Sequence, residues 1–342
     1  MSRFSSTTNH LYNKVFITGG TGFLGSYIIK ELIGKGYSVK AIRRSNNLPF
    51  YIDPSVFSKV ECVEADVLDV VTLHEAMAGC DAVIHAAAKV SFHKKDRSSM
   101  YKTNIEGTAN VINAAIENNI ERVVHISSIA AIGRSSTGDV VTEEKKWQPS
   151  KTTTHYSLSK YWSEIEAWRG FGEGLNLVIA NPATIIGYGD WNTTSCALFK
   201  NVYNEFPWYS EGLNGFVDVE DVARAVVLLM ESSVSGERFI INGDNWGFQQ
   251  LFTTIAKSFN KKPPYKKATP FLGEIAWRME KLKSLFSGKR PLLTKESARV
   301  AHSKTRFSNS KILEALPDFS FTPLDQSIEN ACKKYLKPLQ PL

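Results

Sequence analysis

Short apolar runs alternate with longer amphipathic stretches through the first half of the chain. Each run is nearly continuous rather than apolar at every second position, which is typical of strands covered on both faces. Regular alternation of strands with amphipathic helices predicts right-handed crossovers and a parallel sheet, and therefore a doubly wound α/β domain. The expected strands are 15–18, 38–42, 60–63, 82–85, 122–126 and 177–180, and the expected helices are 22–33, 72–78, 99–117 and 156–168.

The alternation weakens after Pro182, where proline and aromatic residues become denser. A helix over 219–231 and a strand over 238–241 are expected to return to the sheet. Helices over 249–259 and 324–335 are expected to belong to a smaller, mostly helical C-terminal lobe that binds the substrate. The predicted division is 13–182 with about 215–244 for the sheet domain, and 183–214 with 245–342 for the lobe.

Composition and charge exclude several classes of protein. Of the 342 residues, 43% are apolar and 22% charged, which is typical of globular proteins and excludes a disordered or fibrous chain. The net charge of +7 comes without a run of five basic residues, so no nucleic-acid partner is expected. No signal peptide is evident, nor an apolar run near the ~20 residues that span a bilayer, which predicts a cytoplasmic protein. No metal site is expected, because the cysteines lack metal-ligand spacing: Cys62, Cys80, Cys196 and Cys332.

A glycine-rich turn follows the first predicted strand and opens the first predicted helix. Its sequence, Thr18 to Gly25, has the spacing G-x-x-G-x-x-G. Such a turn brings backbone N–H groups and the positive end of the helix dipole to a pyrophosphate, and glycine is needed where a Cβ would block the turn or the ligand. We therefore predict a dinucleotide cofactor and a Rossmann sheet. The loop residues expected at the cofactor are Gly19, Thr21, Gly22, Phe23, Leu24 and Gly25.

Two arginines at the end of the second strand bear on which dinucleotide binds. An NAD-binding protein usually has an acidic residue here for the ribose 2′-hydroxyl, whereas guanidinium groups suit a 2′-phosphate. Arg43 and Arg44 therefore favour NADP, with NAD as the alternative if both arginines only face solvent. Asp66 and Val67 follow the third strand, where Asp66 is placed either to accept from the adenine amino group or to cap the next helix.

The catalytic hypothesis rests on a tyrosine and a lysine one helical turn apart. Tyr156 and Lys160 share one face of a predicted helix. A free phenol has a pKa near ~10, and a neighbouring ammonium group is expected to lower that pKa enough for acid–base catalysis. Ser127 and Ser128 end the fifth strand, at the sheet edge where ligands bind, and a serine hydroxyl there can hold a substrate carbonyl next to Tyr156.

These motifs together resemble the extended short-chain dehydrogenase/reductases of the NAD-dependent epimerase/dehydratase family. The resemblance covers nearly the whole chain and implies a Ser128, Tyr156 and Lys160 triad, with Asn104 supporting the site through water or backbone. It also implies a homodimer formed through helices 99–117 and 156–168. The residues that it places beside the cofactor are Ala86, Ala87, Ala88, Ser127, Tyr156, Lys160, Pro182, Thr184 and Ile185. The segments that carry it are Thr18 to Gly25, Asp66, His85 to Ala88, Asn104 to Thr108, Ser127-Ser128, Tyr156 with Lys160, Pro182 and 216–223.

Departures from the family's patterns help to choose a reaction. The sugar-nucleotide dehydratases carry an Asp-Glu pair after the catalytic serine or threonine, and here Ile129-Ala130 cannot act as acid or base. The sugar-nucleotide epimerases place an arginine before the later segment, where this chain has the uncharged Leu213-Asn214-Gly215. The chain therefore looks most like the dihydroflavonol reductase and hydroxysteroid dehydrogenase members.

Substrate contacts are expected near Ser128 and from aromatic residues of the lobe, although such residues more often belong to the core. An amphipathic helix over 271–286 with basic residues on other faces fits either packing on the lobe or a membrane surface, and membrane contact is not expected. The candidate substrate residues are Ser91, Phe92, Ser128, Trp191 and Phe199.

The predicted function is an NADP(H)-dependent oxidoreductase that interconverts a carbonyl and a secondary alcohol on a small, rather apolar substrate. One alternative is an NAD-dependent sugar-nucleotide epimerase that uses the same triad. An alternative of another class is a non-catalytic dinucleotide-sensing or assembly protein, although this chain keeps both Tyr156 and Lys160.

Overall fold

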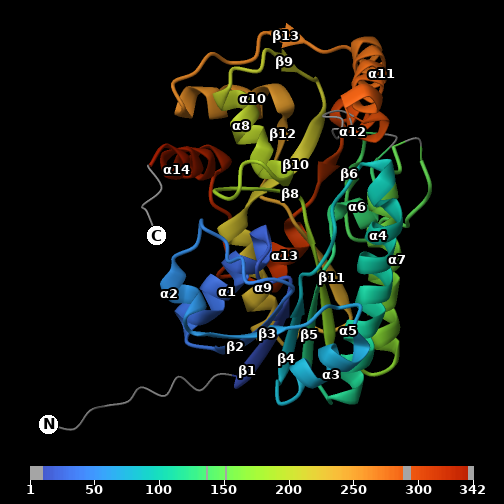
Figure 1. The fold of residues 1–342 in the computed structure, drawn as a ribbon, viewed down its shortest axis with the longest axis vertical. Coiled ribbons are helices and arrows are strands. Elements are labelled where there is room, and N and C mark those ends of the chain that lie inside the picture. Colours follow the sequence, from blue (N-terminus) through green and yellow to red (C-terminus); the bar gives the residue numbers. More distant parts are fainter. Residues whose placement is uncertain (1–10, 136–137, 151, 288–293, 338–342) are drawn as a thin grey trace, which may run out of the picture.

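A parallel seven-stranded sheet forms the centre of the molecule (Figure 1). The computed structural model describes residues 11–135, 138–150, 152–287 and 294–337. The strand order is β11-β7-β5-β4-β1-β2-β3, and every neighbouring pair is parallel. This confirms the predicted α/β fold. The strands are β1 Lys14–Thr18, β2 Ser38–Arg43, β3 Val60–Glu64, β4 Ala82–His85, β5 Arg122–Ile126, β7 Leu177–Pro182 and β11 Glu237–Ile241.

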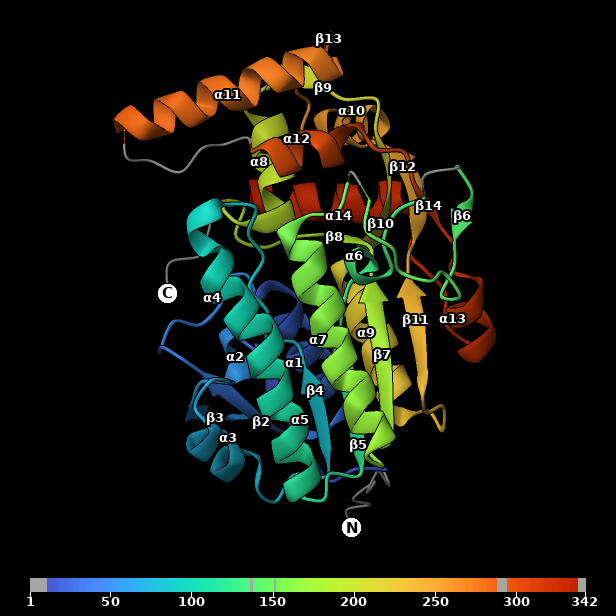
Figure 2. The same cartoon turned by 90° about the vertical axis from the view of Figure 1, so that its right-hand side faces the viewer.

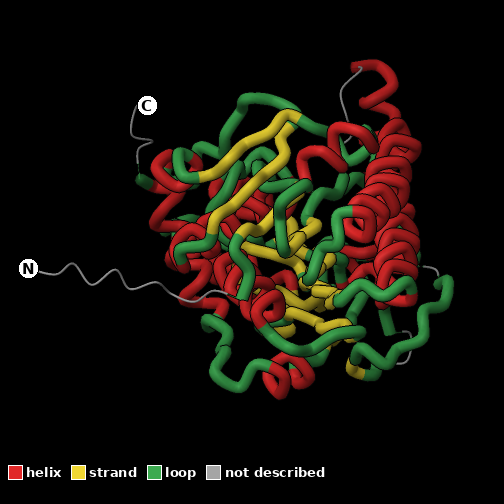
Figure 3. The backbone as a smooth tube through the Cα atoms, turned by 90° about the horizontal axis from the view of Figure 1, so that it is seen from below, coloured by secondary structure: helices red, strands yellow, loops and turns green. Residues whose placement is uncertain are grey.

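Helices cover both faces of the sheet, as the continuous apolar runs require (Figure 3). One apolar cluster joins the sheet to α1 (Phe23–Lys35) and α9 (Val219–Glu231). A second cluster joins the opposite face to α3 (Val70–Met77), α5 (Gly107–Glu117) and α7 (His155–Gly172). The order of the elements therefore places the carboxyl ends of β1, β4, β5 and β7 along one edge, next to the lobe (Figure 2).

The helix expected over 99–117 contains a change of winding. It begins as α4 (Arg97–Tyr101), widens into a π-helical turn over Lys102–Glu106, and continues as α5. Such turns are rare and frequently lie at functional sites. Asn104, one of the candidate site residues, lies in this turn.

The C-terminal lobe contains a small sheet that the sequence did not indicate. β10 (Leu213–Asp218) lies between parallel β8 (Thr184–Ile186) and antiparallel β12 (Asp244–Gly247). An aromatic and aliphatic core packs this sheet against α8 (Ala197–Tyr203), α10 (Phe248–Ser258) and α14 (Leu324–Leu336). None of the described helices is long and apolar enough to cross a membrane.

Shorter elements complete the chain. Two small parallel pairs are β6 (Val140–Val141) with β14 (Arg306–Phe307), and β9 (Trp208–Tyr209) with β13 (Lys266–Lys267). α11 (Pro270–Ser287) lies along the outer side of the lobe, where Figure 2 shows it extending beyond the other helices. The remaining helices are α2 Pro54–Phe57, α6 Ile129–Ile132, α12 Lys295–His302, α13 Ser310–Ala315 and the 3₁₀ turns Lys94–Asp96 and Thr194–Cys196.

Two glycines of α1 make a matched test of the loop packing. A Cβ on Gly25 would collide with the carbonyl oxygen of Gly19, whereas a Cβ on Gly34 would meet no atom within 4 Å. We expect Gly25→Ala to lower the free energy of unfolding by about 1–3 kcal/mol, because backbone must move to make room. Gly34→Ala should raise it by about 0.5–1 kcal/mol, because alanine is the better helix former.

Urea unfolding of both variants measures these changes. Because both variants make the same Gly→Ala change on the same helix, each controls for the general effect of adding a methyl group to α1. A Gly25→Ala protein as stable as the wild type would show that the loop does not pack as described.

Candidate active site

The glycine loop leaves the amino end of α1 open to a ligand. Gly22 is the N-cap residue of α1 and contributes no side-chain cap, so the first N–H groups of the helix are not covered by a capping side chain. The Gly22 N–H donates to the Gly19 carbonyl at 2.9 Å, which closes the turn. Gly19 has a φ of +70°, and a Cβ there would lie 2.7 Å from the backbone of Ala86 and Ala87. The loop and the segment after β4 thus form a close-packed cradle that fits the pyrophosphate of a dinucleotide.

A series of buried side-chain hydrogen bonds holds this cradle in place. The Thr18 hydroxyl accepts from the Ala87 N–H at 3.1 Å and bonds the His85 Nδ1 at 2.7 Å. The other ring nitrogen of His85 bonds the Thr108 hydroxyl at 2.9 Å. Burial lowers the pKa of His85 to about 3, with a smaller effect from Lys160, so the ring is neutral at physiological pH.

The two arginines expected at the 2′-phosphate lie where β2 ends. The Arg43 side chain is half-buried and Arg44 is exposed. Within the described residues neither guanidinium group forms an ion pair. Both are therefore available to an anionic ligand at this edge of the sheet.

Asp66 and Val67 lie in the loop between β3 and α3. The Asp66 carboxylate accepts from the Leu68 N–H at 3.0 Å, and Asp69, not Asp66, caps α3. The alternative that Asp66 is the helix cap is therefore wrong. Val67 is buried, and its side chain would touch any Cβ placed on Gly107.

The structure brings Ser128, Tyr156 and Lys160 together. Thr154 caps α7 reciprocally with Ser157, which fixes the start of the helix one turn before Lys160. Ser128 is the N-cap residue of α6, and its hydroxyl lies close enough to the Tyr156 phenol to lower the pKa of that phenol. The Lys160 ammonium group donates to the Ile126 carbonyl at 2.8 Å, at the end of the same strand that leads to Ser128.

The charges at this site differ from the expectation in one respect. Burial raises the pKa of Tyr156, and the nearby Ser128 hydroxyl opposes that rise. Burial lowers the pKa of Lys160 to about 8, with a smaller opposing effect from Glu164. The expected lowering of the Tyr156 pKa by Lys160 is thus not found here, because the ammonium group is held at the strand-end carbonyl.

Glu164 is a site residue that the sequence analysis missed. Its buried carboxylate accepts from the Ser127 hydroxyl at 2.6 Å and from the Asn181 amide at 2.7 Å. Arg238 neutralises it across 3.0 Å. Asn181 also donates to the Ser128 carbonyl at 3.0 Å. The one available signal was its position one helical turn after Lys160, on the same face of the helix.

Asn104 joins the π-helical turn to the segment after β4 and to α7. Its amide oxygen accepts from the Lys89 N–H at 2.7 Å, and its amide nitrogen donates to the Lys89 carbonyl at 3.0 Å and the Ser159 hydroxyl at 2.9 Å. The side chain is buried. Asn104 therefore joins the backbone after β4 to the helix of Tyr156, which it contacts through the Ser159 hydroxyl.

The expected substrate residues do not all lie together. The Phe92 ring meets the Tyr156 ring edge to face, with centroids 6.1 Å apart. The Ser91 hydroxyl donates to Asp96 at 2.8 Å. Trp191 stacks on Tyr335 of α14.

Phe199 is fully buried, and its ring packs against Phe259 and Tyr335. Its role as a substrate contact is corrected accordingly, because α8 turns this face toward α10 and α14.

The residues expected at the nicotinamide end follow β7. Pro182 ends that strand and is buried, and Ala88 is exposed in the loop after β4. Thr184 and Ile185 are half-buried in β8. The Thr184 hydroxyl accepts from the Asn214 amide at 2.7 Å, which ties this end of the site to β10.

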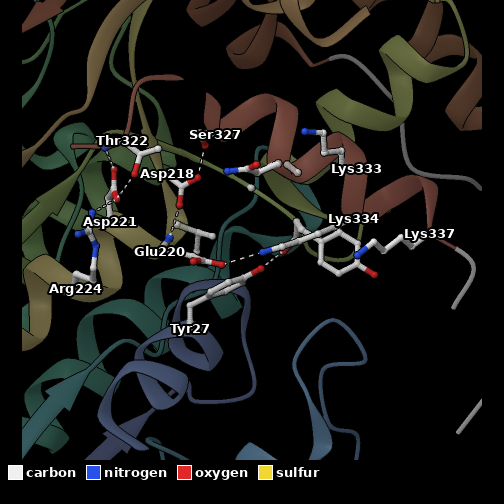
Figure 4. A pocket seen from close by; sticks show the side chains of 15 residues that line it. Tyr27, Asp218, Glu220, Asp221, Arg224, Thr322, Ser327, Lys333, Lys334 and Lys337 are labelled. Atoms are coloured by element: carbon white, nitrogen blue, oxygen red, sulfur yellow. Dashed lines mark hydrogen bonds and ion pairs between the residues drawn. The ribbon is translucent and has the colours of Figure 1, made fainter. Parts of the chain in front are cut away.

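A cavity of about 430 Å³ lies elsewhere, between α1, α9 and α14 (Figure 4). Several of its charged groups pair within the protein. Asp221 binds Arg224 and Thr322, and Glu220 binds Lys334 at 3.0 Å. No triad residue lines this cavity, and we interpret it as the seam between the sheet domain and α14.

The lowered pKa of Lys160 gives a testable pH dependence of stability. The unfolded chain keeps the lysine proton up to about its ordinary pKa of 10.5, whereas the folded chain releases it near pH 8. Below pH 8 the buried, protonated Lys160 therefore lowers the free energy of unfolding of the wild type by a constant amount. This loss is removed as the pH rises from 8 to 10.5. Relative to Lys160→Met, we expect the wild type to gain about 3 kcal/mol over this interval.

Urea unfolding of both proteins at pH 7, 8, 9 and 10 measures the difference, and the other titrating groups cancel in the comparison. A difference that does not change with pH would contradict the lowered pKa.

Comparison with known proteins is consistent with the geometry. The model of the "NAD dependent epimerase/dehydratase family" matches residues 15–242. The chain is 31% identical over 310 residues to the "Putative dihydroflavonol 4-reductase" of Synechocystis sp., covering 88% of each chain. It is 32% identical over 240 residues to the cinnamoyl-CoA reductase 1 of Petunia hybrida, covering 66% of this chain and 71% of the relative.

Among solved structures, the crystal structure of gox2253 superposes with a TM-score of 0.78 and 28% identity, covering 94% of this chain and 98% of that one. The matched family residues span the glycine loop, the triad and β11. The chain therefore belongs to the NAD-dependent epimerase/dehydratase family, and within it is an NAD(P)-dependent carbonyl reductase or dehydrogenase of the extended short-chain type.

Proposed function

We propose that this enzyme uses NADPH to interconvert a carbonyl and a secondary alcohol on a small, largely apolar substrate. The observation that carries the proposal is that the Ser128 hydroxyl lies close enough to the Tyr156 phenol to affect its pKa, with the Phe92 ring against the Tyr156 ring. An aromatic ring and two hydroxyl groups at the carboxyl edge of the sheet suit an apolar molecule with one reactive oxygen.

The cofactor would lie across that edge. Its pyrophosphate fits the glycine loop at the start of α1, and its 2′-phosphate fits Arg43 and Arg44. The preference for NADP over NAD rests on these two guanidinium groups, which no carboxylate of the described residues neutralises. NAD remains the alternative cofactor if they only face solvent.

Bound NADPH supplies a hydride to the substrate carbon. Ser128 and Tyr156 donate hydrogen bonds to the carbonyl oxygen, and the Tyr156 hydroxyl transfers its proton as negative charge develops there. Lys160, one helical turn after Tyr156, would hold the nicotinamide ribose. Alcohol oxidation runs through the same groups in reverse.

The rival reactions have less support at this site. Dehydration lacks an acid–base pair, because Ile129 and Ala130 follow Ser128. Sugar-nucleotide epimerisation lacks an arginine at Asn214. A non-catalytic role fits poorly with a retained and assembled triad. The named substrates of the relatives, a dihydroflavonol and cinnamoyl-CoA, support an aromatic carbonyl compound here.

A homodimer also belongs to the proposal. On α7, Trp162 and Ile165 lie three residues apart on one side of the helix and are 49% and 39% exposed. Pairing α5 and α7 with the same helices of a second copy would bury them.

The test compares the two cofactors on the wild type and on the Arg43→Ala/Arg44→Ala variant. We expect the wild type to oxidise NADPH with an aromatic aldehyde or ketone, and to prefer NADPH over NADH by at least about 100-fold in kcat/KM. Losing two charge-assisted contacts of about 1.5–3 kcal/mol each should remove most of that preference.

The variant Arg278→Ala, on the distant helix α11, serves as the charge control and should keep the preference. Equal use of NADH by the wild type, or NAD retained through purification, would contradict the NADPH assignment and favour the epimerase. Absence of reduction across aldehydes and ketones would contradict the reductase.

A further inference from the structure

Arg134 lies at the junction between the sheet domain and the lobe. It follows α6, the short helix that Ser128 caps. Its Nη1 donates to the Ser303 hydroxyl at 2.8 Å and to the Asn214 amide oxygen at 3.3 Å. Both partners belong to the lobe, and both are neutral.

This guanidinium group has no carboxylate partner among the described residues, although it is half-buried. Arg238 and Arg224, by contrast, pair with Glu164 and Asp221. Burial without a counter-charge lowers the pKa of Arg134 to about 10. A cation removed from water costs free energy unless an anion compensates it, so the position favours an anionic ligand.

One chain of hydrogen bonds runs from Arg134 towards the reacting centre. It passes through Asn214 to the Thr184 hydroxyl, at the expected nicotinamide end. A separate contact, from the Asn181 amide to the Ser128 carbonyl, lies three residues before Thr184 in the chain. Arg134 is thus linked through Asn214 to the segment that carries both Asn181 and Thr184.

Asn214 also belongs to the uncharged segment 213–215 noted in the sequence. Its amide cannot neutralise an anion, but it accepts from a guanidinium group that another part of the chain supplies. The Arg134 guanidinium group therefore lies beside Asn214.

We propose that Arg134 binds an anionic oxygen group, a carboxylate or a phosphate, at the end of the substrate remote from the carbonyl that Ser128 and Tyr156 hold. This inference rests on the proposed function for the identity of the reacting end. The Ser303 and Asn214 contacts engage Nη1, and the remaining N–H groups of the planar guanidinium can present two parallel donors to a carboxylate or phosphate. The substrate is then apolar beside Phe92 and anionic at its far end.

Equilibrium binding to the enzyme saturated with NADP⁺ tests this without turnover. The probes are acetophenone, 4-acetylbenzoate and 4-acetylphenyl phosphate, which share the aryl ketone and differ in the remote group. Dissociation constants are measured by NMR titration for the wild type, Arg134→Gln and Arg134→Lys. Arg224→Gln, at the separate cavity in Figure 4, is the matched loss of one positive charge.

We expect the wild type and Arg224→Gln to bind one of the anionic probes at least about tenfold more tightly than acetophenone, and the favoured anion identifies carboxylate or phosphate as the group. Arg134→Gln should reduce that ratio to near one while its affinity for acetophenone stays within about twofold. Arg134→Lys should restore part of the ratio.

A purely structural role for Arg134 would weaken all three probes together and leave the ratio unchanged, which would overturn the proposal. A wild type that favours acetophenone would overturn it as well. If the ratio depends on Arg134 but no probe is reduced by NADPH, the anion site stands and the proposed reductase activity fails.

Discussion

The catalytic edge depends on one buried carboxylate, that of Glu164. Four elements meet there, because Glu164 on α7 binds Ser127 after β5, Asn181 in β7 and Arg238 in β11. Burying an isolated carboxylate is costly, and the Arg238 guanidinium together with two neutral donors offsets that cost. Arg238 is in turn fixed by the carbonyls of Glu143 and Lys145. The position of Ser128 follows, since Asn181 holds its carbonyl.

The same burial sets the protonation of the neighbouring groups. Lys160 lies one turn before Glu164 in a site dry enough to lower its pKa to about 8, and it is satisfied by the Ile126 carbonyl. His85 and His125 are driven to the neutral form by burial and by Lys160. The pKa of Lys160, at about 8, thus lies close to physiological pH. Ligand binding that repositions its ammonium group would therefore change the electrostatics of the phenol most directly.

Features encoded locally were predictable from the sequence, whereas the frame that holds them was not. Continuous apolar runs located the strands of the sheet. The glycine turn and the spacing of Tyr156 and Lys160 identified the carboxyl edge of the sheet as the candidate site. The supporting contacts join residues far apart in the chain, such as Glu164 with Arg238 at a separation of 74 and Arg134 with Ser303 at 169. No spacing rule connects such pairs. Phe199 was expected to contact the substrate and is instead fully buried. Apolar character in the sequence does not distinguish a residue that lines a pocket from one that belongs to the core.

We propose that Tyr156 transfers the proton that accompanies hydride transfer, and the Tyr156→Phe variant removes that proton donor. Stopped-flow measurement of a single turnover separates hydride transfer from NADPH binding. The control is Tyr101→Phe, because the Tyr101 hydroxyl bonds His155 at 3.0 Å and its loss removes a nearby phenol. We expect Tyr156→Phe to slow hydride transfer about 10²- to 10⁴-fold with NADPH affinity nearly unchanged, while Tyr101→Phe stays within a few-fold of the wild type. A hydride-transfer rate in Tyr156→Phe within about threefold of the wild type would contradict it.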